Sequence, residues 1–229
     1  MPQHLVDVCI PALDENNYFP ETLSYLTEQS LYKKDMMQII VCECIADGRE
    51  SYLESILKQI KHTKFVRTPV ANIGYQRNLA IAQGDSPIIV NFDADAHFED
   101  PHAIEILIDP IISKEMVVTH CPHKFPDGSA AENNRLSKTV LDFKNELNRY
   151  LPIAWGVGLT FRRDAWQRVG GFPTHTKSLE DCLMTIKLSL EYSMMRKQQV
   201  NIYATVSDRR ENQFYKNPLT AYDYSYHYR

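Results

Sequence analysis

The sequence predicts an α/β domain with a mostly parallel central sheet covered by helices on both faces. Two observations carry this prediction. Through the first hundred residues, short β-branched apolar runs alternate with segments whose apolar residues recur at helical spacing, and the links are short. The predicted strands are apolar throughout rather than at alternate residues, which is typical of strands buried on both faces of a parallel sheet. The length of 229 residues suits one such domain.

The first half of the chain is expected to contain four strands, over residues 5–10, 36–44, 64–67 and 88–90. Helices are expected between them. The first begins near Pro20, which suits a first helical turn, and the second carries an apolar face between Tyr52 and Ile60. A third covers residues 75–83 and ends at Gly84, a residue favoured at helix C-termini.

The second half is less regular. A helix through Ile104 and Leu107 is expected to break at Pro110, and residues 124–134 are rich in turn residues and are expected to form a mobile loop. The next helix carries one apolar stripe, made of Leu136, Val140, Phe143 and Leu147. Further strands are expected over residues 116–120, 155–161 and 200–206, and further helices over residues 163–169 and after Ser178.

The last residues place four tyrosines on one face of an extended segment, namely Tyr222, Tyr224, Tyr226 and Tyr228. We expect an edge strand or an interface strip there. Contact with an acceptor or a membrane surface is the alternative.

Composition bears on several classes of function. The net charge of −4 offers no electrostatic case for a nucleic-acid partner. No apolar run approaches the roughly 18 residues of a transmembrane segment, and the N-terminus lacks the pattern of a signal peptide. The five cysteines are scattered and odd in number, which favours reduced thiols and a cytoplasmic location. Two basic pairs, Arg162–Arg163 and Arg209–Arg210, are candidates for binding a small anionic ligand.

Two carboxylates follow the strand predicted at residues 88–90. Asp93 and Asp95 are two residues apart, so on an extended chain both would point into a crevice at the carboxyl end of the sheet, where ligands bind in open α/β folds. Paired carboxylates repel each other unless a cation is present, and oxygen ligands suit Mg²⁺ or Mn²⁺ held together with substrate phosphates. Asp-x-Asp by itself is also a common solvated turn.

Other polar segments fall where predicted strands end or helices begin. They are residues 11–15, 46–48, 72–78, 170–172 and 180–181. Because strand ends converge at one edge of a parallel sheet, these segments are expected to line the same crevice as the aspartate pair.

These stretches, in this order, resemble the family 2 glycosyltransferases, which have the GT-A fold, a Rossmann-like variant of the predicted architecture. The matching stretches are Val-Cys-Ile-Pro-Ala-Leu-Asp-Glu, Asn-Ile-Gly-Tyr-Gln-Arg-Asn-Leu-Ala-Ile-Ala-Gln-Gly-Asp, Phe-Asp-Ala-Asp, Phe-Arg-Arg-Asp-Ala-Trp-Gln-Arg-Val-Gly-Gly-Phe and Leu-Glu-Asp-Cys. The resemblance covers roughly residues 5 to 190. It implies one domain over residues 1–229, with a nucleotide-sugar-binding half over 1–98, an acceptor-binding half over 99–206 and a C-terminal tail over 207–229.

The resemblance also implies roles for single residues. Asp95 corresponds to the metal ligand that bridges to the donor diphosphate, and Asp181 to the general base. The donor is expected to contact Pro11, Ala12, Glu15, Asp47, Arg77 and Asp93. The acceptor is expected to contact Trp155, Gly156 and Glu180.

The implied reaction is physically consistent with these residues. Displacement of a nucleoside diphosphate from a sugar carbon places negative charge on the leaving phosphate, and Mn²⁺ or Mg²⁺ together with an arginine can stabilise that charge. A carboxylate can take the proton of the attacking hydroxyl. One carboxylate acting as the base implies direct displacement and inversion of the sugar carbon. The partners implied are a nucleotide-diphosphate sugar and a glycan, lipid or protein acceptor, and self-association is left open.

Several alternatives remain at this point. A sugar-1-phosphate nucleotidyltransferase shares the layout but would be expected to carry a glycine-rich basic loop after the first strand, which residues 13–18 lack. A non-catalytic nucleotide-sugar binding protein and a retaining transferase are also open. Asp181 follows Ser178 by three residues and could instead belong to a capping box. Any further metal ligand is undetermined among His175, Asp208 and His227.

The base pocket departs from the family pattern. The family commonly has two acids before the glycine at the end of its second strand, whereas Ala46 precedes Asp47 here. Glu43 is a candidate substitute. The Gln-x-x-Arg-Trp motif of processive polysaccharide synthases is absent from the sequence, which argues against a processive enzyme.

Overall fold

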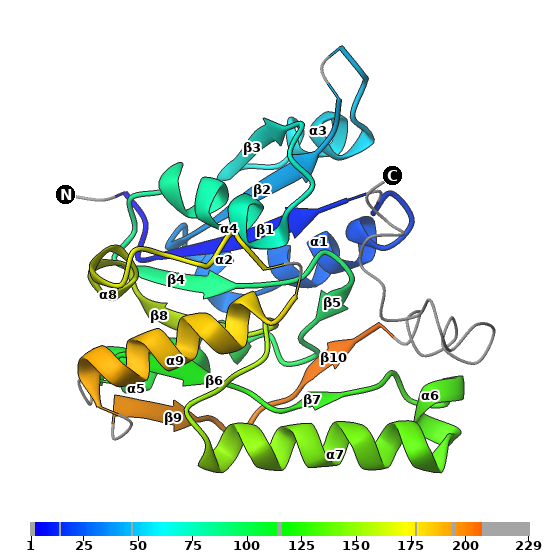
Figure 1. Ribbon diagram of the computed structural model, residues 1–229. Coiled ribbons are helices and arrows are strands. Elements are labelled where there is room, and N and C mark those ends of the chain that lie inside the picture. The colour runs from blue at the N-terminus through cyan, green and yellow to red at the C-terminus, as the bar shows by residue number, and fades with distance from the viewer. Residues whose placement is uncertain are drawn as a thin grey trace.

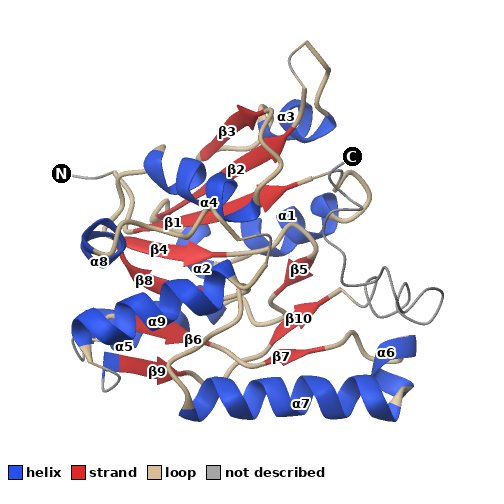
Figure 2. Cartoon of the chain, in the orientation of Figure 1, coloured by secondary structure: helices blue, strands red, loops and turns tan. Residues whose placement is uncertain are grey.

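The computed structural model describes residues 3–13, 15–46, 48–113, 116–176, 178–193 and 196–207, and the expectations for Asp47, Asp208, Arg209–Arg210, His227 and the tyrosines of 222–228 lie outside these ranges. A seven-stranded sheet runs through the centre of this part in the order β3-β2-β1-β4-β8-β6-β9 (Figures 1 and 2). Its strands are β1 (Val6–Ala12), β2 (Met37–Cys44), β3 (Thr63–Thr68), β4 (Ile88–Asn91), β6 (Val118–His120), β8 (Leu159–Arg162) and β9 (Lys197–Gln199). All neighbours pair in parallel except β8, which is antiparallel to both β4 and β6.

Helices cover both faces of the sheet, which confirms the predicted architecture. Those on one face are α1 (Phe19–Thr27), α2 (Ser30–Lys33), α3 (Tyr52–Leu57) and α5 (Ala103–Ser113), and those on the other are α4 (Ile73–Ala82), α8 (Arg163–Arg168) and α9 (Glu180–Tyr192). Strand β1 shows why two cores form. Val8 and Ile10 point into the core with Phe19, whereas Cys9 points into the core with Ile81, because successive side chains of a strand face opposite ways.

A small second sheet lies beside the carboxyl end of the first. In it β10 (Ala204–Val206) pairs antiparallel with β5 (Ala96–His97) and parallel with β7 (His123–Lys124). The short helix α6 (Ala130–Asn133) and the long helix α7 (Arg135–Tyr150) flank it, with α7 along the edge of the molecule (Figure 1). Within the described residues, no helix combines the length and the apolar character that crossing a membrane requires.

Three local expectations are wrong. Helix α5 continues through Pro110 to Ser113, because burial of Ile108 and Ile111 on either side of Pro110 offsets a backbone hydrogen bond that proline cannot make. The segment expected as a mobile loop, residues 124–134, contains the end of β7 and helix α6, which Ser129 caps by accepting from the Glu132 amide. Residues 155–158 form a loop, and β8 begins at Leu159.

The apolar stripe of α7 lies outward. Leu136 and Phe143 are each 62% exposed, whereas the buried residues of α7 are the polar Ser137 and Asn148. Contacts of polar groups hold the helix in this orientation. The Asn145 side chain accepts from the His123 amide at 2.9 Å and donates to the His123 carbonyl at 2.8 Å. At the end of α7, Lys197 Nζ donates to the Asn148 carbonyl at 2.6 Å, where a cation also favours the helix dipole.

The basic pair Arg162–Arg163 has a structural role, which corrects the expectation of an anion site. Arg163 Nη2 lies 2.6 Å from Oδ2 of the fully buried Asp7, and Arg162 pairs with Asp164 at 2.5 Å. Both guanidinium groups are therefore neutralised by carboxylates of the chain itself.

Candidate functional site

A cavity of about 470 Å³ opens at the carboxyl end of the parallel strands. Its wall gathers four carboxylates and one guanidinium from three elements far apart in sequence. Asp93 and Asp95 come from the turn after β4, Arg77 from α4, and Glu180 and Asp181 from the first turn of α9. The aspartate pair sits in a turn rather than on an extended strand as expected, yet both residues line the same cavity.

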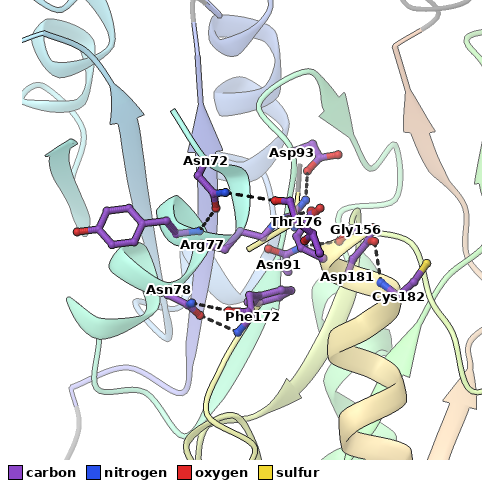
Figure 3. A network of polar contacts seen from close by, with 12 residues as sticks. Asn72, Arg77, Asn78, Asn91, Asp93, Gly156, Phe172, Thr176, Asp181 and Cys182 are labelled. Atoms are coloured by element: carbon purple, nitrogen blue, oxygen red, sulfur yellow. Dashed lines mark hydrogen bonds and ion pairs between the residues drawn. The ribbon is translucent and has the colours of Figure 1, made fainter. Parts of the chain in front are cut away.

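Arg77 lies at the centre of this group (Figure 3). Its Nη2 atom donates to Asp93 Oδ1 at 3.0 Å, and its Nε atom lies 3.3 Å from Glu180 Oε1. The guanidinium also stands over the Phe172 ring, 5.6 Å from its centroid. Arg77 is only 1% exposed, so its charge is directed at the acids of the cavity rather than at solvent.

The two acids at the start of α9 are buried. Burial raises the pKa of Glu180 to about 7, against the opposing attraction of Arg77. Burial also raises the pKa of Asp181, again opposed by Arg77. The pKa of Glu180 thus lies where a carboxyl can exchange protons near neutral pH, the property required of a general acid or base, and the pKa of Asp181 is shifted in the same direction.

The local backbone around Asp181 does not form the capping box considered above. Leu179 is the N-terminal cap of α9, no side chain caps the helix, and the carboxylate of Asp181 accepts from the Cys182 amide at 2.7 Å. Leu179 has a φ of 64°, an uncommon value for a residue other than glycine. Such strained residues often occur at functional sites, and this one directly precedes the two acids.

Gly156 makes the close packing of the acids with Arg77 possible. A Cβ atom at this position would lie 2.7 Å from Arg77 Nη2 and 3.3 Å from Asp181 Oδ2. Its carbonyl accepts from Asn91 Nδ2 at 2.7 Å, which fixes the loop against β4 (Figure 3). The neighbouring Trp155 lines the cavity, and Lys144 Nζ from α7 lies 5.2 Å from the centroid of its ring.

Two asparagines that were not predicted as site residues fix the positions of the segments around the cavity. Asn78 Nδ2 donates to the Phe172 carbonyl at 2.9 Å and its Oδ1 accepts from the Phe172 amide at 2.9 Å, which ties α4 to the Gly170–Gly171–Phe172 segment. Asn72 caps α4 by accepting from the Tyr75 amide and donates to the Thr174 carbonyl at 3.0 Å. The sequence motif could have identified them, because both asparagines belong to the family stretch that also contains Arg77.

His123 is a further missed residue of the cavity wall. Burial lowers the pKa of His123, and its Nε2 atom lies 2.9 Å from the Val157 carbonyl. A carbonyl only accepts hydrogen bonds, so Nε2 carries the proton and Nδ1 is left as the acceptor of a neutral ring. His175, considered as a metal ligand, is exposed and does not line the cavity.

The predicted donor residues of the first strand lie elsewhere. Pro11, Ala12 and Glu15 are buried at the carboxyl end of β1 and do not line the 470 Å³ cavity. The Gln76 side chain joins this end of β1 to β2 by donating to the Ala12 carbonyl at 2.8 Å and to the Cys42 carbonyl at 3.0 Å. Glu43 is buried and accepts from Ser51 Oγ at 2.5 Å.

The oxygen chemistry of the cavity suits a hard divalent cation. Asp93 and Asp95 supply carboxylate oxygens on one wall, and Mg²⁺ or Mn²⁺ is commonly held by one or two carboxylates while substrate phosphates complete the coordination. Among the described residues there is no group of three or more His, Cys, Asp or Glu residues arranged to hold a metal by themselves. The residues present therefore fit a cation that is shared with a bound phosphate.

A larger cavity, of about 650 Å³, adjoins the first and shares His123, Phe125 and Leu141 with its wall. Its wall has mixed charge, including Lys124, Asp142 and Arg149, and it contains none of the four carboxylates described above. We therefore place the chemistry in the smaller cavity.

Comparison with known proteins agrees with the motifs. The sequence profile of "Glycosyl transferase family 2" matches residues 7–170. The O-antigen chain rhamnosyltransferase RfbN of Salmonella typhimurium (strain LT2) is 27% identical over 197 residues, covering 80% of this chain and 60% of that protein. The chain thus spans less than two thirds of the length of this relative.

Solved structures show the same fold. The mannosyltransferase PcManGT from Pyrobaculum calidifontis, in complex with GDP-Man and Mn²⁺, has a TM-score of 0.67 at 19% identity and covers 90% of this chain and 58% of its own. TarS 1–349 from S. aureus, in complex with UDP-GlcNAc, has a TM-score of 0.62 at 18% identity and covers 89% of this chain and 56% of its own.

These likenesses confirm the expected GT-A fold. The profile match extends over most of the chain and includes the aspartate pair and Arg77, so the chain belongs to glycosyl transferase family 2.

Proposed function

We propose that this chain transfers a sugar from a nucleotide-diphosphate donor to an acceptor hydroxyl, with a divalent cation at Asp95 and inversion at the sugar carbon. The observation that carries the proposal is the gathering of four carboxylates in one cavity with a buried arginine, at the carboxyl end of the parallel strands. The carboxylates are those of Asp93, Asp95, Glu180 and Asp181. Family membership supports the reaction class.

The charge of the cavity supports the cation. The wall carries four carboxylates against the cations Arg77 and Lys144, and a divalent ion would offset part of this negative charge. Asp95, supported by Asp93, would hold the ion. When bound, the cation stabilises the negative charge of the leaving diphosphate.

The position of Asp181 supports a role as the base. Its carboxylate is buried in the cavity that Trp155 also lines, a Cβ atom at Gly156 would lie 3.3 Å from its Oδ2 atom, and burial raises its pKa, which increases its strength as a base. Asp181 takes the proton of the acceptor hydroxyl as the oxygen attacks the sugar carbon from the side opposite the diphosphate. Arg77 orients Glu180 directly and lowers the proton affinity of both acids.

The proposal covers classes of donor and acceptor rather than single compounds. PcManGT with GDP-Man and TarS with UDP-GlcNAc bind different nucleotide sugars, and RfbN is named a rhamnosyltransferase, so these relatives support a nucleotide sugar without selecting a base or a sugar. The acceptor remains a glycan, a lipid or a protein.

A donor-hydrolysis screen tests the proposal. Purified protein is incubated with a panel of nucleotide sugars in Mn²⁺, in Mg²⁺ and in chelator, and release of the nucleoside diphosphate is measured. We expect release with one class of donor, loss of that release in chelator, and loss of both turnover and metal-dependent nucleotide binding in Asp95→Ala. The matched control is Asp109→Ala, an exposed acid on α5, which should behave as wild type. Metal-independent turnover, or full activity of Asp95→Ala, would refute the metal assignment.

A further inference from the structure

The larger of the two cavities is not used by the proposed reaction. Its volume is about 650 Å³, and its wall is formed by β7, helix α7 and the segment that joins β9 to β10. We call it the outer cavity, and we call the 470 Å³ cavity with the four carboxylates the reaction cavity. A cavity as large as the outer one holds a ligand of drug size, which is comparable with a short oligosaccharide.

The outer cavity begins where the reaction cavity ends. His123, Phe125 and Leu141 belong to the walls of both, so the two cavities adjoin at these side chains. His123 is held in place at this junction, because its Nε2 atom donates to the Val157 carbonyl at 2.9 Å and its backbone carbonyl accepts from Asn145 Nδ2 at 2.8 Å. A ligand that extends beyond the reaction cavity on this side therefore meets a fixed wall.

The outer cavity lies away from the part of the sheet assigned to the donor. The predicted donor contacts Pro11, Ala12 and Glu15 lie at the end of β1, next to β2 and β4 in the sheet order. The outer cavity lies instead near β7, α7 and the end of β9, on the far side of the molecule from β2 and β3 (Figure 1). A donor that reaches the reaction cavity from β1 therefore leaves the side toward the outer cavity open to the acceptor.

The wall of the outer cavity carries charges of both signs. It contains three Lys or Arg residues and four Asp or Glu residues. An alkyl chain placed there would remove such groups from water, which costs free energy, so the wall does not suit a lipid tail. Three bases against four acids leave little net charge, so neither a strong anion nor a strong cation is favoured.

The remaining groups of this wall suit a neutral sugar. Gln199 and Asn201 supply amide side chains, which donate and accept hydrogen bonds as sugar hydroxyls do. Tyr203 is 53% exposed and offers an apolar ring with a polar edge, which matches the apolar face and polar rim of a sugar ring. Protein partners depend on large apolar anchors that fill pockets, whereas most residues of this wall are charged or carry amides.

We propose that the acceptor is a glycan of two or more sugars, whose terminal sugar enters the reaction cavity while the preceding sugars occupy the outer cavity. The inference rests on the proposed function for the reaction at the terminal sugar. Binding of the preceding sugars, in contact with Asn201 and Tyr203, can be measured without any donor.

Saturation-transfer NMR on the full chain tests this proposal. The probes are methyl glycosides of glucose, galactose, mannose, rhamnose and N-acetylglucosamine, each offered as the monosaccharide and as a linear trisaccharide, without donor and in chelator. The outer cavity holds neither aspartate of the proposed cation site, so binding there needs no metal. We expect at least one trisaccharide to bind, with saturation of its internal sugars, and the matching monosaccharide to bind about tenfold more weakly.

Two substitutions assign the binding to the outer cavity. Tyr203→Ala and Asn201→Ala, both at exposed residues of its wall, should each weaken binding of that trisaccharide by about tenfold. The matched control is Tyr52→Ala on α3, where the tyrosine is 48% exposed and outside both cavities, and it should bind as wild type. Absence of binding by every trisaccharide, equal binding of a trisaccharide and its monosaccharide, or unchanged binding by both variants would overturn the proposal.

The donor-hydrolysis screen gives a separate result. If a trisaccharide binds as expected and no donor is hydrolysed, the glycan site stands and the proposed transfer reaction fails. If a donor is hydrolysed and no trisaccharide binds, the transfer reaction stands and the outer cavity is not a glycan site.

Discussion

Two arginines that pair with buried acids lie at opposite ends of the central sheet, and their surroundings differ in charge. At the amino end, Arg163 pairs with Asp7 at 2.6 Å and donates to the carbonyls of Ser86 and Ile81 at 2.6 and 2.7 Å. Asp7 also accepts from the Ser86 hydroxyl at 2.6 Å. At the carboxyl end, Arg77 faces Asp93, Glu180 and, through its charge, Asp181.

The difference separates a structural cluster from a reactive one. The Arg163 cluster is closed, with one carboxylate for one guanidinium and a hydrogen bond to a backbone carbonyl from each of the other two nitrogen atoms. The Arg77 cluster is open to a cavity and gathers more acids than the one arginine pairs with, which leaves room for a cation. Burial, together with the neighbouring acids, raises the pKa of Glu180 to about 7. Buried charge that is only partly balanced is a property of functional sites rather than of stabilising ones.

The largest expected effect is on catalysis at the open cluster. We predict that Asp181→Asn lowers the rate of sugar transfer by about 10²–10⁴-fold, because the amide cannot accept the hydroxyl proton. Donor affinity should stay within a few-fold of wild type, since Asp181 is assigned to the acceptor side. Initial rates and nucleotide titrations measure the two quantities. If the variant transfers sugar at the wild-type rate, Asp181 is not the general base.

Breaking the closed cluster should cost stability instead. We predict that Arg163→Met lowers the free energy of unfolding by about 3–5 kcal/mol, because Asp7 is left buried without its partner. Urea unfolding measures the change, and Arg168→Met, at an exposed ion pair with Glu191, serves as the control with an effect below about 1 kcal/mol. Equal effects of the two substitutions would contradict the structural role of Arg163.

The corresponding substitution at Arg77 should cost less. We predict a loss of about 1–3 kcal/mol for Arg77→Met, because Glu180, with a pKa of about 7, can take up a proton near neutral pH, whereas Asp7 is enclosed. The loss should be smaller at pH 6 than at pH 8, and the acidic limb of the pH–rate profile should move to higher pH. A pH-independent loss as large as that of Arg163→Met would show that the two clusters do not differ.

The last expected effect is a slope in stability with pH. Glu180 keeps its proton in the folded protein up to a pKa of about 7, whereas the unfolded chain loses it near 4.5. The folded state therefore binds more protons in this window, and the free energy of unfolding falls as pH rises through it, by about 1.4 kcal/mol per pH unit. Glu180→Gln should lack this component. Urea unfolding of both proteins from pH 5 to 7 measures the difference, in which the contributions of the buried histidines cancel. If the free energy of unfolding depends on pH equally in both proteins, Glu180 does not bind its proton more tightly in the folded state.

Predictions from sequence succeeded where a local pattern decides the structure. The strands and helices of the first half were predicted within a few residues, because β-branched runs, helical spacing and turn residues act over short distances. Asp93, Asp95, Arg77, Glu180 and Asp181 were selected from motifs, and the structure brings them to one cavity. Their roles as metal ligand, donor contact and base stay predictions.

Predictions failed where the deciding contact comes from a distant part of the chain. The spacing of Leu136, Val140 and Phe143 identified an amphipathic helix but not the side on which it packs, which Asn145 and Lys197 settle through polar contacts. The pair Arg162–Arg163 resembled an anion site until Arg163 was found against Asp7, 156 residues earlier.

By itself, then, the order of apolar runs and polar motifs determined a layered α/β chain with acids at the ends of its strands, since periodicity is a property of neighbouring residues. Only the tertiary structure decided which arginine is neutralised and which faces a surplus of carboxylates, because charge balance depends on distances across the folded molecule. The same holds for the outward face of α7, whose exposure is set by what packs on its other side.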